Sequence, residues 1–253
     1  MKGEKHALVI FIQCCLFVCH GFGLALLVVL TKLLFMVYVR FDKRRRIAIM
    51  IGSDSDLKQF ENALNFLALM VKNHEPFVKV LRVYTNSIHR NTLITLWRLF
   101  WLWLTCVDVI IVAAGWANHL SGVCEAFVRY VLKSRNIMIV PMACDAKNDR
   151  KNRAAILSIS EVPKHQMEVF PQKDETTVFL SAKSAKYLAQ EVGVYFGEDG
   201  AVDAVKLACS IDIKPKKLPS RVPPKSRSLI EAITTAHELN EAERRKEEEK
   251  GSK

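Results

Sequence analysis

Short apolar runs alternate with helical patterns through the middle of the chain, and this alternation constrains the fold more than any other feature. The apolar runs have the length of buried strands, and helical spacing of apolar residues follows them. The strand-like runs are residues 47–51, 78–83, 107–112 and 137–140, and the helical segments include 93–103 and 123–133. Such alternation predicts a parallel sheet covered by helices on both faces. We therefore expect one α/β domain over residues 47–198, closing near Phe196.

Residues 1–46 form a hydrophobic N-terminal segment that ends in a basic run. From residue 7 to residue 39 the only Asp, Glu, Lys or Arg is Lys32. A helix rises about 1.5 Å per residue, so this stretch is long enough to cross a hydrocarbon core of roughly 30 Å. The basic run at residues 40–46 predicts that the following domain stays in the cytoplasm. We expect a membrane anchor over residues 7–39; a soluble cytoplasmic protein, a signal peptide or a misassigned extension are the alternatives.

Residues 199–253 differ in composition from the middle of the chain. Prolines lie among Lys and Arg between residues 214 and 227, a mixture that cannot build a core and predicts an extended linker. Helix-forming residues follow from Ser228 to Lys250, and the end of this stretch is almost wholly charged. We expect a basic linker followed by a surface or partner-binding helix.

The net charge of +11 does not indicate a nucleic-acid-binding protein. Most of the excess lies in two short basic runs, at residues 43–46 and 214–227, outside the expected core. A nucleic-acid-binding domain more typically spreads basic residues over a folded face, with aromatic platforms or a reading motif among them. The seven cysteines are odd in number and contain no CxxC pair, so they predict neither a disulfide framework nor a zinc site.

Three polar segments follow predicted strands, at the ends where an open parallel sheet gathers its ligand site. The first is Gly52 to Asp56 (GSDSD), in which a tight turn, hydroxyls and a helix start can bind an anion. The second is Ser87 to Arg90 (SIHR), which has an imidazole beside a guanidinium suited to phosphate. The third is residues 109–122 (VIIVAAGWANHLSG), a buried strand that runs into a loop of small residues carrying His119. Each alone is an ordinary feature, but together they predict one crevice.

In this order and spacing, the three segments resemble the N5-carboxyaminoimidazole ribonucleotide mutase family, also called AIR carboxylases, of the class found in bacteria, fungi and plants. Members of that family read approximately GSxSD, SAHR and AGAGGAAHLPG at the corresponding places. The resemblance extends from about Ile47 to Val194 and leaves both terminal segments uncovered. It implies a three-layer α/β sandwich with a flavodoxin-like parallel sheet, assembled into a homo-octamer.

The activity implied by the resemblance is a step of de novo purine biosynthesis, the IMP pathway. It moves a carboxylate from the exocyclic nitrogen of N5-carboxyaminoimidazole ribonucleotide to ring carbon C4, without a metal or an organic cofactor. The chain would then be an isomerase (mutase) or a carboxylase of the lyase type, with the ribonucleotide as its partner. Such chemistry needs a group that delivers and later removes a proton, and imidazole titrates in the useful range. His89 matches the family's catalytic histidine, and His119 ranks second.

The same match implies which residues hold the ribonucleotide. Arg90 and the hydroxyls would bind the phosphate, Asp56 would bind the ribose, and the loop around Gly115 would complete the pocket. The substrate-binding residues implied by the resemblance are Ser53, Ser55, Asp56, Ser87, Arg90, Gly115 and Leu120.

Several positions depart from the family pattern. Ala113 and Trp116 stand where the family has glycine, Asn118 where it has alanine, and Ser121 where it has proline. Trp116 is the largest change, because the absence of a Cβ lets a glycine backbone approach a ligand. One alternative is therefore a non-catalytic, membrane-tethered relative that retains the fold and a nucleotide site. A second is a small multi-span membrane protein that uses residues 93–114 as a further span.

Overall fold

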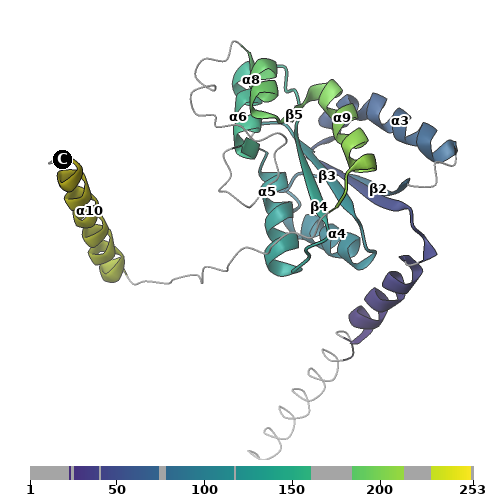
Figure 1. Ribbon diagram of the computed structural model, residues 1–253, viewed down its shortest axis with the longest axis horizontal. Coiled ribbons are helices and arrows are strands. Elements are labelled where there is room, and N and C mark those ends of the chain that lie inside the picture. The colour runs from purple at the N-terminus through teal and green to yellow at the C-terminus, as the bar shows by residue number, and fades with distance from the viewer. Residues whose placement is uncertain are drawn as a thin grey trace, which may run out of the picture. The chain divides into compact units, whose positions relative to one another are not determined.

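The computed structural model describes residues 23, 26–39, 41–73, 78–116, 118–160, 184–213 and 229–251 (Figure 1). The chain divides into two compact units, Met1–Pro219 and Ser220–Lys253. In the second unit the described residues form one helix, α10 (Leu229–Gly251), which agrees with the helix expected in the charged C-terminal stretch. The expected basic linker over residues 214–227 lies outside the described residues. Residues 176–179, whose sequence also suggests a short strand, lie outside them too.

The described strands of the first unit form a five-stranded, all-parallel sheet, as the alternation of the sequence predicts. The strands are β1 (Arg45–Ile51), β2 (Val78–Thr85), β3 (Val109–Ala114), β4 (Met138–Ala143) and β5 (Tyr195–Phe196), in the order β2-β1-β3-β4-β5. Every residue of β3 and β4 is buried. Burial on both faces explains why the central strands read as continuous apolar runs rather than as alternating ones.

Helices cover both faces of the sheet (Figure 1). On one face lie α3 (Glu61–Lys72) and α9 (Gly197–Ser210); on the other lie α4 (Thr92–Leu104) and α5 (His119–Ala126), which continues into a π-helical turn (Phe127–Val131). Ile47, Ile49 and Ile51 pack toward the first face, while Ala48 and Met50 pack toward the second. A smaller apolar cluster joins α6 (Asp149–Ser160) to α8 (Ala185–Val192). The alternation of side chains along β1 therefore divides the core into two halves.

Helix α9 corrects the expected end of the domain. A boundary at residue 198 leaves almost all of α9 outside, yet Ala201, Ala204, Val205 and Ala208 are fully buried in the core. These small side chains let the helix approach the sheet closely, and a Cβ added at Gly200 would lie only 2.9 Å from the backbone of Tyr195. The core therefore extends at least to Ala208.

The structure describes all of one hydrophobic segment considered as a membrane span, residues 93–114, and part of the other, residues 7–39. Residues 93–114, considered as a second membrane span, instead form most of α4 and all of β3 inside the domain. Residues 26–39 of the expected anchor form a helix, whose Lys32 donates hydrogen bonds to the Trp103 carbonyl and, at 3.3 Å, to Cys106 Sγ. Within the described ranges, no helix combines the length and the apolar character needed to cross a bilayer. Most of the remaining anchor residues lie outside these ranges.

Candidate active site

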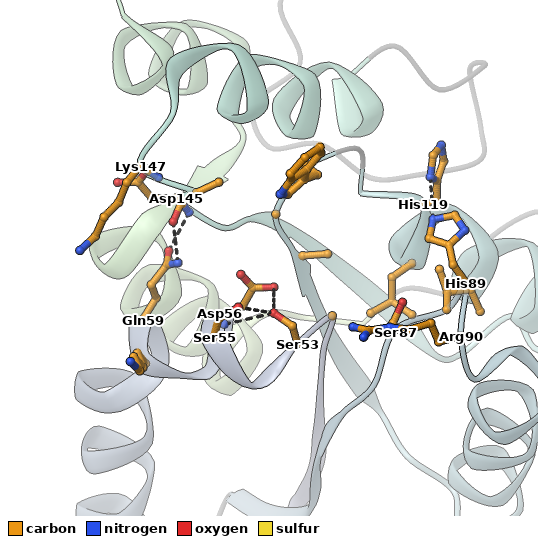
Figure 2. Close-up of a pocket in the computed structure, with 18 of the residues that line it drawn as sticks. Ser53, Ser55, Asp56, Gln59, Ser87, His89, Arg90, His119, Asp145 and Lys147 are labelled. Atoms are coloured by element: carbon orange, nitrogen blue, oxygen red, sulfur yellow. Dashed lines mark hydrogen bonds between the residues drawn. The ribbon is translucent and has the colours of Figure 1, made fainter.

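A cavity of about 1000 Å³ lies at the carboxyl ends of the first four strands, lined by the loops that follow them (Figure 2). Parallel strands present their carboxyl ends at one edge of the sheet, so loops distant in sequence meet there. The cavity contains every site residue expected from the sequence, namely Ser53, Ser55, Asp56, Ser87, His89, Arg90, Gly115, His119 and Leu120. In Figure 2 the two histidines lie at one side of the cavity, and Ser87 and Arg90 lie between them and the Ser53 loop.

The loop after β1 is held by a close backbone approach and by its own hydroxyls. A Cβ at Gly52 would lie 2.9 Å from the Cβ of Ala114, so only glycine fits without a shift of the neighbouring strand end. Ser53 Oγ donates to Asp56 Oδ2 at 2.8 Å and lies 2.7 Å from Ser55 Oγ. This network fixes the Asp56 carboxylate and leaves it further lone pairs for a ligand.

The loop after β2 presents His89 and Arg90 on a turn that is fixed from both sides. Before the turn, the backbone amide of Asn86 donates to the carbonyl of Ile51 on β1 at 2.8 Å. After it, the Thr92 hydroxyl donates to the Ile88 carbonyl at 2.6 Å, and the Ile88 side chain is buried in the core. His89 and Arg90 are exposed to the cavity, and Arg90 makes no ion pair or hydrogen bond with its side chain among the described residues.

The two histidines of the cavity contact each other directly. His119 Nδ1 lies 3.2 Å from His89 Nε2, and the rings meet edge to face with centroids 5.1 Å apart. A hydrogen bond between these nitrogens needs one donor and one acceptor, so both rings cannot be imidazolium while the contact is kept. The pair can therefore hold one shared proton at the edge of the cavity, and can pass it between the two rings.

Two departures from the family pattern, Asn118 and Ser121, form a bonded pair at the start of α5. Asn118 is fully buried; its Oδ1 accepts from the Ser121 amide at 3.2 Å, and its Nδ2 donates to the Met142 carbonyl at 2.8 Å. Ser121 Oγ donates back to the Asn118 carbonyl at 3.0 Å. Proline at position 121 has no amide hydrogen, so serine there supplies the donor that an asparagine cap requires. This cap fixes the position from which His119 extends.

Trp116, the largest departure, lies at the rim of the cavity without filling it. Its side chain is 61% exposed, and Lys151 Nζ lies 3.8 Å from the centroid of its ring. The residue has a φ of +59°, in the left-handed region that suits glycine. The neighbouring Gly115 lies beside the Asp56 carboxylate, since a Cβ there would be 3.5 Å from Asp56 Oδ1, an ordinary contact distance.

Several residues of the cavity lie outside the three predicted segments, among them Gln59, Asp145, Lys147 and Glu198. Gln59 holds the loop after β4 by two bonds, donating to the Asp145 carbonyl at 3.0 Å and accepting from its amide at 2.8 Å. Asp145 and Lys147 follow a predicted strand, so the strand-end rule could have found them. Glu198 lies in the first turn of α9 and follows no predicted strand, so the same rule could not have found it.

The chemistry available in the cavity is that of oxygen and nitrogen side chains. Acidic Asp56, Asp145 and Glu198 line it together with basic Arg90 and Lys147, a mixture suited to a ligand with both a phosphate and hydroxyls. Burial holds the pKa of the adjacent Cys144 thiol well above its usual range, so this cysteine stays protonated. Among the described residues, no group of three or more His, Cys, Asp or Glu side chains lies close enough to hold a metal ion.

No family model matches this chain, and no curated protein matches it in sequence.

Proposed function

We propose that the chain is an N5-carboxyaminoimidazole ribonucleotide mutase, an AIR carboxylase of de novo purine biosynthesis. The observation that carries the proposal is the meeting of the three family-like segments in one cavity, with His89 and His119 in contact beside Arg90. The strand order β2-β1-β3-β4-β5 is that of flavodoxin-like sheets, which supports the three-layer sandwich expected for the family.

The proposed reaction needs only one mobile proton. An imidazolium at His89 gives its proton to the exocyclic nitrogen as the bond to the carboxylate breaks, and the bonding electrons stay on that nitrogen. The released carbon dioxide is then attacked by ring carbon C4, which forms a new carbon–carbon bond. The proton on C4 returns to His89 and restores the aromatic ring, so the reaction balances without an oxidant or a metal. His119 positions the His89 ring through the 3.2 Å contact.

The remaining cavity residues bind the ribonucleotide in this proposal. Arg90, whose guanidinium has no partner in the described part of the chain, pairs with the phosphate, and the hydroxyls of Ser53, Ser55 and Ser87 donate to the same group. Asp56 accepts from the ribose hydroxyls, since its carboxylate lies beside the Gly115 backbone on the inner side of the loop. Gly115 and Leu120 line the same wall of the cavity.

One observation favours a second candidate, a non-catalytic relative that still binds the nucleotide. Trp116 stands at a family glycine with a φ of +59°, and a bulky ring at this position changes how the loop meets a ligand. Membrane attachment through residues 7–39, with the domain in the cytoplasm, and assembly into a homo-octamer stay predictions of the sequence. Detergent-dependent fractionation and the sedimentation of the purified chain would test them.

The experiment that tests the proposal follows the interconversion of the two carboxylated ribonucleotides by the full chain and its His89→Asn variant. We expect the variant to lose roughly 10²-fold or more in turnover, because a general acid–base group contributes about that much. A matched control is His237→Asn on α10, an exposed histidine outside the first unit, which should leave the rate unchanged. An inactive parent that still binds 5-aminoimidazole ribonucleotide supports the non-catalytic candidate, and a parent that does neither contradicts both.

A further inference from the structure

An aromatic ring with a cation on one face stands at the cavity where the family has only a glycine. Trp116 lines the cavity, and Lys151 Nζ lies 3.8 Å from the centroid of its indole ring. Among the described residues, those that line the cavity include Trp116 but not Lys151, which extends from the first turn of α6. We infer that the ammonium group lies on the face of the indole that is turned away from the cavity.

The backbone conformation of Trp116 costs free energy, which the rest of the fold has to offset. A bulky residue at a φ of +59° is an outlier, because its Cβ crowds the backbone in the left-handed region. Such strain is found mainly where the surroundings fix it and where the side chain serves a ligand. The ring nevertheless stays 61% exposed, so burial of apolar surface does not account for its position.

The position of the ring relative to the other groups indicates which part of a ligand it meets. Gly115, the preceding residue, approaches the Asp56 carboxylate, and His119 lies three positions further along the same loop. In the proposed function Asp56 holds the ribose and the histidines serve the reacting base. Since Trp116 lies between Gly115 and His119 in the sequence, we expect its ring to meet the base and Arg90 to meet the phosphate.

We propose that Trp116 is the platform on which the carboxylated imidazole ring of the substrate stacks, and that Lys151 makes this platform selective for the carboxylated form. This inference rests on the proposed function. An indole face alone is electron-rich and disfavours an anion, whereas a cation on its opposite face offsets that negative field. The pair thus supplies a base-binding subsite in place of the backbone approach that glycine permits.

The test measures binding to the full chain by titration calorimetry, with three probes: 4-carboxy-5-aminoimidazole ribonucleotide, 5-aminoimidazole ribonucleotide and ribose 5-phosphate. Trp116→Gly should weaken binding of the carboxylated ribonucleotide roughly tenfold, because the loss of stacking on an aromatic ring has about this effect per base. Binding of ribose 5-phosphate, which has no base, should not change. Trp116→Phe keeps a ring and should retain most of the affinity.

Lys151→Met separates selectivity from stacking. This variant should bind the carboxylated ribonucleotide severalfold more weakly and the uncarboxylated one as tightly as the parent does, since only the former carries an anion on its base. Trp97→Ala is the matched control, because Trp97 is 63% exposed on α4 and does not line the cavity. That variant should bind all three probes as the parent does.

The results that overturn the inference differ from those that overturn the proposed function. If Trp116→Gly binds the carboxylated ribonucleotide as tightly as the parent or more tightly, the indole is an obstruction and the stacking platform is refuted. If the parent binds ribose 5-phosphate but neither ribonucleotide, the base subsite and the proposed function are both refuted, and only a phosphate site stands. If the parent binds none of the three probes, the proposed function fails and this inference fails with it. Urea unfolding of Trp116→Gly confirms that the variant is folded, because relief of the strained φ should leave it at least as stable.

Discussion

The polar residues at the two ends of the sheet differ in their surroundings: at one end they are bonded to each other, and at the other they are exposed to a cavity. At the amino ends of β1 and β3, Arg46 and Asp108 are hydrogen-bonded to each other through side chains and backbone. Arg46 donates from Nη2 to Asp108 Oδ1 at 2.8 Å and from its backbone amide to Asp108 Oδ2 at 2.8 Å. The Asp108 backbone amide donates to the Arg46 carbonyl at 2.9 Å. At the carboxyl ends, Arg90 and His89 are exposed to a cavity. Arg46 is only 6% exposed.

This difference separates residues that hold the fold from residues that are available to a ligand. A buried ion pair whose members bond each other ties two strands together and has little capacity left for a third molecule. An exposed guanidinium without a partner does nothing for the fold and keeps all its donors for an anion. We therefore expect substitutions at the amino end of the sheet to change mainly the free energy of unfolding. Substitutions of exposed residues at the carboxyl end should change mainly the affinity for a ligand.

The largest effect is expected from Asp108→Ala at the amino end. Removing the carboxylate leaves the Arg46 guanidinium buried without its partner, which should lower the free energy of unfolding by about 3 kcal/mol, toward the lower end for broken buried pairs because Asp108 is 28% exposed. Urea unfolding measures the change, and Asp212→Ala, at an exposed aspartate, is the control. A loss of less than about 1 kcal/mol would mean that water hydrates the Arg46 guanidinium in the variant, so that the pair contributes no more than a surface ion pair.

Gly52→Ala should have the next largest effect, at the carboxyl end. The added Cβ would lie 2.9 Å from the Ala114 Cβ, and forcing such a contact should cost about 2 kcal/mol of stability. The displaced loop should also weaken the binding of ribose 5-phosphate. Gly122→Ala in α5 is the matched control, because a Cβ there meets nothing within 4 Å and alanine favours the helix by roughly 1 kcal/mol. Equal stability of the two variants would contradict the tight contact between the loops.

Arg90→Met tests the open end of the sheet directly. Affinity for ribose 5-phosphate should fall about tenfold or more, since a charge-assisted hydrogen bond to a phosphate contributes roughly 1.5 to 3 kcal/mol. The free energy of unfolding should stay within about 0.5 kcal/mol of the parent, as for an exposed residue whose side chain contacts no partner in the described part of the chain. Calorimetric titration and urea unfolding of the same preparation give both values. A large loss of stability with unchanged affinity would reverse the comparison.

The smallest effect is expected from acid titration of Asp42, just before β1. Hydrogen bonds from the Arg44 guanidinium, at 2.8 and 2.9 Å, lower the pKa of the Asp42 carboxyl to about 2. Because the folded pKa lies below the unfolded one, this pair stabilises the fold above about pH 4, and the contribution is lost as the pH falls toward about 2. The unfolding temperature of the parent should therefore be higher than that of Asp42→Asn at pH 6, and the difference between the two temperatures should disappear near pH 2. A gap that is constant with pH would exclude the carboxylate as its cause.

Sequence reasoning found the loops of the cavity more completely than it found the walls. Residues such as Ser53 and His89 come directly after apolar runs, so the strand-end rule located them without any knowledge of packing. Glu198 could not be found in this way, because α9 is built from small residues whose burial depends on how closely the helix approaches the sheet. The helix at residues 93–103 and the sheet itself agree with the prediction, whereas the domain end at residue 198 does not.

The sequence by itself determined the parallel α/β sheet and the set of loops at its carboxyl edge, because apolar periodicity and strand polarity are local properties. Only the tertiary structure decided that His119 meets His89, that Lys151 lies against the Trp116 ring, and that Asn118 and Ser121 bond each other around the start of α5. The physical reason is that the His119–His89 and Lys151–Trp116 contacts each join different elements of the fold. Their geometry therefore depends on how the helices pack against the sheet. A difference of one rotamer, which no sequence pattern encodes, is enough to make or break such a contact.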